Sequence, residues 1–560
     1  MQGVDEYGGN VQTCRLVGIY KLTQSMSDDE YAQIVAHFPE LNVKQPEWTI
    51  IKFDDTVSDP ANITNLDNGT GYDYGTDYVP SAHVNAILAA RHRVIAKNTA
   101  EGVMTVCRLL DSDGRRYYDG TEANTKGFAH LEKEDEGDVM LWEPHRWQKG
   151  VDDFVNHVHY SCFSSLAQVT PAPGVKVYLQ DMETTGGKVV RTSSTYETLA
   201  DALYDYVDFS VHEVSVAGWK RVRFPAISST AYGAVFVDDE GNILGRVSTS
   251  DVRMVSGDYL FANVPQGATK LVFTTMNSAA FSFVWLTNSL RIEDVEPDPV
   301  EVEPYLVGVY KANTDNQQIR SISDRTPTVS TTGTAWRNWR TQRGTGWQLI
   351  DYRMHRDIAN LFFAKYGTRN SQAKCGNGSG ANTTKTGYTD ALGMQDTVMP
   401  SNGGNGGQYV NAEGNIATCT SINALGYENL WGNISEFCDG VTINARVWNV
   451  EGEGVRPYKA ASAAGYITAI KHGRYMDVIP MATAGSSSTQ YCDHYNVSDS
   501  NSRVLYRSYH NANAEGGVSS ENAYSDASNS YTYNGSRLAF RGRIVEASSV
   551  AAFLAAEMIS

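Results

Sequence analysis

The sequence contains few cysteines and no long apolar run. Only seven cysteines occur in 560 residues, and no two of them form a CxxC pair. Their odd number and wide spacing argue against a disulfide framework or a zinc knuckle and predict buried, reduced thiols. No segment has the roughly 18 uninterrupted apolar residues of a membrane span, and the first residues lack a basic stretch followed by an apolar one. We therefore expect a protein without a signal peptide or a membrane span, made in a cytoplasm.

Positive charge is also scarce. Lys and Arg total 46 against 64 Asp and Glu, which gives a net charge of −18. Proteins that bind DNA or RNA take most of their affinity from Lys and Arg, so we expect no nucleic-acid partner. The apolar fraction of 41% is typical of globular proteins, and the length allows about two to four domains.

Two proline-containing segments predict domain boundaries. TPAPG interrupts the chain at 170–174, and the acidic run EDVEPDPVEVEP at 293–304 is typical of an extended connector. Between them, short alternating segments such as AVFVDD and KLVFTTM indicate a β-sandwich. We therefore divide the chain into an N-terminal α+β region (1–170), a β-sandwich (171–293), an acidic linker (294–304) and a C-terminal domain (305–560).

Helical periodicity occurs in two places. In the N-terminal region, apolar residues recur near helical spacing at Val84, Ile87, Leu88, Val94 and Ile95. In the C-terminal domain, residues 349–366 place apolar side chains on one face of a helix. The text after this helix is mostly Gly-rich and Asn-rich loop sequence. We predict an α+β fold class, in which regular elements support long loops.

Two motifs of the C-terminal domain carry a family resemblance. LGYENLWGNISEFCDG at 425–440 combines Trp431, a Gly432–Asn433 turn, Glu436 and Phe437. NGSRLAFRGRI at 534–544 reads as a terminal strand with Arg537 and Phe540. Together they resemble the GNVWEW-type and GFRL-type phrases of the C-type lectin fold that formylglycine-generating enzymes share with the variable proteins of diversity-generating retroelements. The resemblance covers roughly residues 305–545 and implies this fold and a structural role for these motif positions.

The segment between the motifs uses a restricted set of residues. Tyr, Ser, Asn, Asp, His and Gly are crowded between 491 and 534. In the retroelement family, copying errors at adenines convert AAC asparagine codons into codons for these residue types, so the resemblance implies a hypervariable segment. Tyr offers a large rigid contact area, whereas Ser, Gly and Asn form adaptable hydrogen bonds, as in antibody loops. We therefore predict a ligand-binding surface.

The positions that we predict to be exposed and ligand-facing are Asp493, His494, Tyr495, Asn496, Ser498, Tyr506, Ser508, Tyr509, His510, Asn511, Asn513, Asn522, Tyr524, Ser525, Tyr531, Tyr533 and Asn534. The interleaved Val497, Val504, Leu505, Val518 and Ala527 are predicted to be scaffold. The alternative is a polar low-complexity loop without a ligand.

Enzymatic alternatives have less support in the sequence. A formylglycine-generating oxidase uses a close pair of C-terminal cysteines to bind copper, but Cys492 has only Cys438 as a candidate partner. A polysaccharide-degrading tail enzyme would need acids such as Glu136, Asp138 and Glu143, or the turn at 238–240, although solvated carboxylates are far commoner. We predict no catalytic residue and no cofactor. A calcium ion is compatible with the Asn-rich loops, but no DxDxDG spacing supports it.

Taken together, the sequence suggests a receptor-binding protein of a phage or prophage tail, located on the virion. VPQGATKLVF at 264–273 resembles the closing strands of jelly-roll modules in phage tail proteins and carbohydrate-binding modules. The expected partners are a bacterial host-surface protein or glycan, other tail proteins and further copies of the chain, for which a trimer would suit a tail tip. A second arrangement places residues 136–147 and 305–313 in one domain, with the sandwich as an insertion. A variable protein displayed by a cell would instead need an export signal or a lipidation site.

Overall fold

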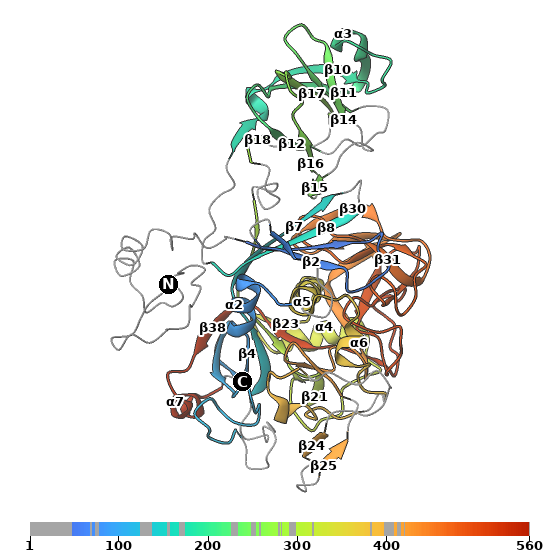
Figure 1. The fold of residues 1–560 in the computed structure, drawn as a ribbon. Helices are drawn as coiled ribbons and strands as arrows, with labels where there is room; N and C mark the ends of the chain where they lie inside the picture. Colours follow the sequence, from blue (N-terminus) through green and yellow to red (C-terminus); the bar gives the residue numbers. More distant parts are fainter. Residues whose placement is uncertain are drawn as a thin grey trace, which may run out of the picture. The chain divides into compact units, whose positions relative to one another are not determined.

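The computed structural model describes residues 48–558, except 68–69, 73–77, 124–136, 154–156, 167–173, 226–232, 248–253, 257–258, 278–280, 282, 290–297, 316–317, 381–383, 397–407, 411–415 and 419–420. Strands hold 43% of the residues and helices 13%, so the chain is β-rich and the predicted α+β class is wrong (Figure 1). Apolar residues of the N-terminal region account for part of the error. Helix α2 (Ala82–Ala90) ends before Val94 and Ile95, which lie in a strand.

A seven-stranded sheet combines segments from distant parts of the chain. Its strands, in spatial order, are β23 (Trp347–Leu349), β37 (Leu538–Phe540), β20 (Tyr305–Gly308), β6 (Asp138–Glu143), β4 (His92–Ala100), β5 (Val103–Arg108) and β38 (Arg543–Glu546). β6 and β20 are antiparallel neighbours, with Leu306 opposite Trp142. Residues 138–143 and 305–308, from the two segments 136–147 and 305–313, therefore lie in the same sheet.

This sheet is strongly curled. β37 and β38 lie on opposite sides of four other strands in the sheet, yet only residues 541–542 separate them along the chain. Two connecting residues reach roughly 10 Å, whereas five strand spacings in a flat sheet would need about 24 Å. Hydrogen bonds close the gap, because Arg543 N donates to Gly102 O (3.0 Å) and Arg541 N donates to Gly346 O (2.8 Å).

Both faces of the curled sheet are buried. On β6, Val139 and Leu141 belong to the large core, whereas Met140 belongs to a second core with Leu306 and Phe540. Successive side chains of a strand point to opposite faces, so two cores on alternate residues identify a sheet that is covered on both sides. Continuous apolar text such as VMLW at 139–142 is the sequence counterpart of this arrangement.

Helix α5 (Tyr352–Tyr366) fills the large core and confirms the helix predicted over 349–366. The Oδ1 of Asp351 accepts a hydrogen bond from Met354 N (2.8 Å) at its start, and Gly367 ends it with φ 62°. The remaining helices are short: α3 (Leu199–Ala202), α4 (Gly333–Gln342), α6 (Ser371–Cys375) and α7 (Val550–Ala555). Among the described residues, no helix is long and apolar enough to cross a membrane.

A nine-stranded sheet carries much of the segment 491–534. Its order is β30 (Gly454–Lys459), β29 (Val447–Val450), β28 (Ser435–Asn444), β34 (Arg503–Arg507), β35 (Glu521–Ala523), β33 (His494–Val497), β31 (Gly465–Lys471) and β32 (Ile479–Thr483), with β36 (Asn534–Gly535) parallel to β28. Two-stranded ladders complete this part: β21 (Asn313–Asp315) with β22 (Gln318–Arg320), β24 (Gln408–Val410) with β25 (Ile416–Thr418), and β26 (Asn423–Ala424) with β27 (Tyr427–Glu428).

Residues 175–287 build a sandwich with its own core. One sheet is five-stranded, in the order β10 (Glu183–Val190), β11 (Leu203–Ser215), β17 (Lys270–Met276), β13 (Ala234–Val237) and β14 (Ile243–Val247). The facing strands are β9 (Val175–Tyr178), β18 (Phe283–Thr287), β12 (Arg221–Pro225), β16 (Tyr259–Asn263) and β15 (Met254–Ser256). Phe224, Phe236 and Phe273 pack between them.

The second sandwich sheet continues through a single pairing, Val255 with Asp152, into the strands β7 (Arg146–Asp153), β8 (Val158–Ser164), β1 (Thr49–Asp54), β2 (Ile63–Asp67) and β3 (Thr70–Tyr72). The chain enters the sandwich after β8 and returns at β19 (Val300–Val302), which pairs with β7. Residues 300–302 of the predicted acidic linker are thus a strand, and residues 294–297 lie outside the described residues.

A buried charge cluster connects these N-terminal strands to the C-terminal half. His159 contacts Asp152 and Asp55, each at 2.8 Å, and Asp55 also accepts hydrogen bonds from Tyr491 OH (2.7 Å) and Ile470 N (3.0 Å). Burial alone would lower the pKa of His159, but the two carboxylates outweigh it and raise the pKa from 6.5 to about 10. The charged imidazole therefore stabilises the fold.

We predict that this cluster makes the free energy of unfolding decrease as the pH becomes alkaline. A raised histidine pKa adds stability that is fully present below pH 6.5 and is lost as the pH rises through about 10, roughly 5 kcal/mol in all. Urea unfolding at pH 6, 8 and 9.5 should show this decline, and His159→Gln should remove it. His157→Asn is the matched control, because His157 is exposed and its φ of 55° suits Asn. An unchanged pH slope in His159→Gln would contradict the prediction.

Candidate functional site

The turn at 431–433 is fixed by burial and backbone conformation. Trp431 is buried, and its indole N–H donates to Gly376 O (2.8 Å). Gly432 and Asn433 both have positive φ, 77° and 60°. A Cβ on Gly432 would lie 2.8 Å from Asn377 O, so only glycine fits. This turn is a rigid element that neighbouring loops can use as a support.

Arg537 holds the two motifs together. Its guanidinium makes five hydrogen bonds: to Glu436 Oε1 (2.7 Å), Gly308 O (2.9 Å), Val309 O (2.6 Å), Glu428 O (3.0 Å) and Asn429 O (3.2 Å). Glu436 also contacts Lys311 Nζ (2.8 Å) and His355 Nε2 (3.0 Å). Burial opposes the charge of Glu436, but Arg537 and Lys311 hold its pKa well below the usual range.

The motif aromatics Phe437 and Phe540 belong to one hydrophobic core. Phe437 contacts the Tyr506 ring, with centroids 5.7 Å apart, and Phe540 contacts Trp347 at 5.6 Å. All seven motif positions, Trp431, Gly432, Asn433, Glu436, Phe437, Arg537 and Phe540, are buried. They form the support of the site and not its surface.

The segment 491–534 is tied to the 432–435 turn by backbone hydrogen bonds. Gly432 N donates to Ser508 O (3.3 Å), Asn511 N donates to Asn433 O (3.0 Å), and Ser435 N donates to Tyr533 O (2.8 Å). The start of the loop 508–520 and the end of the loop 524–533 are therefore held on the same turn.

Four aromatic rings from these two loops stack in a column. Tyr509 stacks on His510 (4.9 Å between centroids, 10° between planes), His510 on Tyr533 (4.1 Å, 19°), and Tyr533 on Tyr531 (5.2 Å, 2°). Tyr531 is 38% exposed, and the other three rings are half-buried. We call Tyr509, His510, Tyr531 and Tyr533 the aromatic column. It joins the two loops and presents ring edges and polar atoms at the surface.

Eleven predicted ligand-facing residues reach the surface at least in part. These are His494, Asn496, Ser498, Tyr509, His510, Asn511, Asn513, Asn522, Tyr524, Tyr531 and Tyr533. Tyr524 is the most exposed tyrosine of the segment, at 60%. Tyr466, on β31, was not predicted, and its ring meets His494 edge-on at 5.4 Å. No local pattern marks Tyr466, because the pairing of β31 with β33 is long-range.

The prediction of exposure is wrong for Asp493, Tyr495, Tyr506, Ser508, Ser525 and Asn534, which are buried. Tyr495, Tyr506 and Asn534 lie in the strands β33, β34 and β36, where the loop-rich expectation placed no strand, and their side chains are buried there. Asp493 accepts a hydrogen bond from Ser519 N (2.7 Å), and Ser508 Oγ accepts one from the buried Lys311 (3.0 Å). Lys311 is a further residue that the sequence did not reveal. Of the predicted scaffold, Val504, Leu505 and Val518 are buried, whereas Val497 and Ala527 are half-buried.

The candidate catalytic groups are engaged in the fold. Asp138 pairs with Arg320 (3.1 Å) and Arg343 (2.7 Å), and Glu143 pairs with Arg91 (2.6 Å). The turn acid Asp238 binds Asn242, and Glu136 lies outside the described residues. Within the described part of the chain, no group of three or more His, Cys, Asp or Glu is arranged to hold a metal ion.

Five cysteines lie in the described residues, and all five are buried, as predicted: Cys107, Cys162, Cys375, Cys438 and Cys492. Cys14 and Cys419 lie outside the described residues. Burial raises the pKa of Cys492 to about 12 and that of Cys438 well above its usual value. Neither thiol is therefore prepared for nucleophilic chemistry at neutral pH.

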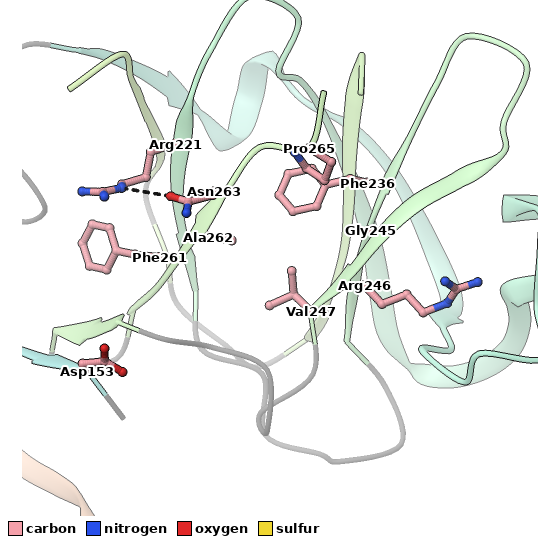
Figure 2. A pocket seen from close by; sticks show the side chains of 10 residues that line it. All are labelled: Asp153, Arg221, Phe236, Gly245, Arg246, Val247, Phe261, Ala262, Asn263 and Pro265. Atoms are coloured by element: carbon pink, nitrogen blue, oxygen red, sulfur yellow. Dashed lines mark hydrogen bonds between the residues drawn. The ribbon is translucent and has the colours of Figure 1, made fainter. Parts of the chain in front are cut away.

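The sandwich contains a cavity of about 360 Å³ between its two sheets. Figure 2 shows Phe236 and Pro265 on one side and Phe261, Arg221 and Asn263 on the other, where Arg221 Nε donates to Asn263 Oδ1 (3.4 Å).

No protein-family model and no curated protein matches this chain.

We predict that Arg537→Met strongly destabilises the protein. The substitution removes the guanidinium that neutralises the buried Glu436 carboxylate and removes one hydrogen-bond donor from each of four carbonyl groups. This should lower the free energy of unfolding by about 3 to 5 kcal/mol. Arg543→Met lies at an exposed position on β38, the next strand along the chain. This substitution should change the free energy of unfolding by less than about 0.5 kcal/mol. Urea unfolding followed by tryptophan fluorescence measures both. Equal effects of the two substitutions would show that Arg537 is not the central contact.

Proposed function

We propose that this chain is the receptor-binding protein of a phage or prophage tail and recognises a host-surface protein or glycan without chemical conversion. The aromatic column carries the proposal. It places four rings from two loops on a rigid turn, so a ligand meets a surface whose ordering entropy has already been lost during folding. Tyr and His supply both apolar area and hydrogen-bonding atoms, as in antibody binding sites.

The support of the column is separate from the column itself. The buried residues around Arg537 and Glu436 fix the backbone, whereas the column and Tyr524 extend from loops. This division suits a protein whose surface residues change while its fold is retained, as in the variable proteins that the WGNISEF and GSRLAFRG phrases resemble. We therefore include diversification by a retroelement in the proposal.

Noncatalytic binding is favoured over the enzymatic alternatives. Asp138 and Glu143 are paired with arginines and Asp238 is bound to an amide, whereas the Cys438 and Cys492 thiols are buried with raised pKa values. Several copies on one particle would convert weak single contacts into strong adsorption. We accordingly include homo-oligomerisation and assembly with other tail proteins.

We predict that Tyr531→Ala combined with Tyr533→Ala reduces binding to host cells by about tenfold or more, because buried or stacked aromatics dominate contact energies. The measurement is adsorption of fluorescently labelled, full-length protein to a panel of bacterial strains by flow cytometry. Tyr118→Ala is the matched control, because Tyr118 is 44% exposed and lies outside 491–534. Unchanged adsorption of the double variant to every strain that binds the wild type would refute the assignment of the surface.

Diversification is tested by the neighbouring DNA. We expect a near-copy of the coding region for residues 490–540 that differs only at template adenines and lies beside a reverse transcriptase gene. Absence of such a copy would remove the diversification part of the proposal. Release of reducing ends from host capsule by the purified protein would instead establish the polysaccharide-degrading alternative.

A further inference from the structure

A second concave surface lies at one end of the seven-stranded sheet. It is a cavity of about 450 Å³ lined by Trp142, Glu303, Pro304, Arg541, Gly542 and Ile544. Trp142 lies on β6, and Glu303 and Pro304 directly precede β20. Arg541 and Gly542 connect β37 to β38, and Ile544 lies on β38. The open ends of curled sheets are frequent ligand sites. We propose that this cavity, which we call the sheet-end cavity, binds a neutral hexose unit of a glycan.

Trp142 gives the cavity a rigid apolar wall. It lies directly opposite His92 on β4 and Leu306 on β20, so the three side chains share one face of the sheet. Its indole stacks on the His92 ring, with centroids 5.7 Å apart and planes at 16°, and remains only half-buried. One face of a hexose carries several C–H groups and is apolar enough to pack on such a ring. A flexible surface tryptophan would lose more entropy on binding.

Arg541 supplies an oriented hydrogen-bond donor. Its Nη2 lies 3.4 Å from Asp351 Oδ2, and its guanidinium lies over the Tyr305 ring, 4.9 Å from the centroid. The Arg541 side chain is 25% exposed and lines the cavity, so its guanidinium can donate to a sugar hydroxyl group.

Glu303 supplies an acceptor at the rim of the same cavity. Its side chain is exposed, and it precedes Pro304, which fixes the local backbone. Gly542 also lines the cavity, and a Cβ there would lie 2.6 Å from Phe540 and 2.9 Å from Gly102 O, so the sheet fills the space beside it on that side. A donor and an acceptor beside an apolar wall match the hydroxyl groups of a hexose, which both donate and accept. The opposite charges of Arg541 and Glu303 favour a neutral sugar over an acidic one.

The sheet-end cavity and the aromatic column lie at opposite ends of the same terminal stretch. The column ends at Tyr533, before β36, whereas the cavity begins at Arg541, after β37. None of its lining residues lies between 491 and 534, so its ligand would remain the same when the column changes. This inference therefore does not depend on the proposed function of the column.

The test is saturation-transfer NMR on the full-length protein with methyl α-glucoside, methyl β-galactoside and methyl α-mannoside as probes. We expect transfer to the ring C–H protons of at least one probe. Trp142→Ala should abolish this transfer, and Glu303→Gln should raise the Kd about tenfold, as expected for a lost hydrogen bond to a charged group. Glu301→Gln is the matched control, because Glu301 is exposed on β19 and does not line the cavity.

Three outcomes would overturn the inference. They are absence of transfer to all three probes, transfer that Glu303→Gln and Glu301→Gln leave equally unchanged, and binding of methyl β-glucuronide without binding of any neutral probe. Glu303 is exposed, so Glu303→Gln retains the fold and keeps the test decisive if Trp142→Ala unfolds. Tyr531→Ala with Tyr533→Ala should leave the transfer intact, which separates this site from the column.

Discussion

The ion pair between Arg537 and Glu436 is the contact on which the rest of the C-terminal half depends. It joins the terminal strand to β28, and the same guanidinium binds carbonyl groups of residues 308–309 and 428–429. Only arginine offers enough planar donors for such an arrangement. These bonds offset the cost of burying Arg537, and the contact of Lys311 with Glu436 helps to offset the cost of burying the carboxylate. The ion pair therefore fixes the backbone that carries both loops.

This support explains how a short segment can serve two purposes. On β33 and β34, Tyr495 and Tyr506 face the core, whereas Tyr509 and Tyr533 contribute to the column between the loops. A surface that varies must therefore leave the inward positions close in size and polarity to the present residues, since the buried ones contact β28 and its neighbours. Under the proposed diversification, fewer positions could vary freely than the polar composition of 491–534 indicates.

The curled sheet is connected to both surfaces at which we propose recognition. Its strands come from chain segments before and after the sandwich. The core of the sandwich, between β12 and β17, shares no residue with the large core. The sandwich thus has a core of its own. Strands β4, β5 and β6 instead share one sheet and one core with strands β20, β37 and β38. One end of the curled sheet leads to the aromatic column through β36 and β37, and the other leads to the sheet-end cavity through Arg541.

The sequence by itself determined local features: a helix within 349–366, the burial of the cysteines among the described residues, and the tight turn at Gly432 and Asn433. These depend on neighbouring residues, and periodicity or glycine placement reveals them. The tertiary structure alone decided the β-rich class, the burial of residues such as Asp493, and the meeting of His510 with Tyr533. Strand pairing joins positions far apart in the chain, such as Leu306 and Trp142, so no local pattern specifies which face of a strand is covered.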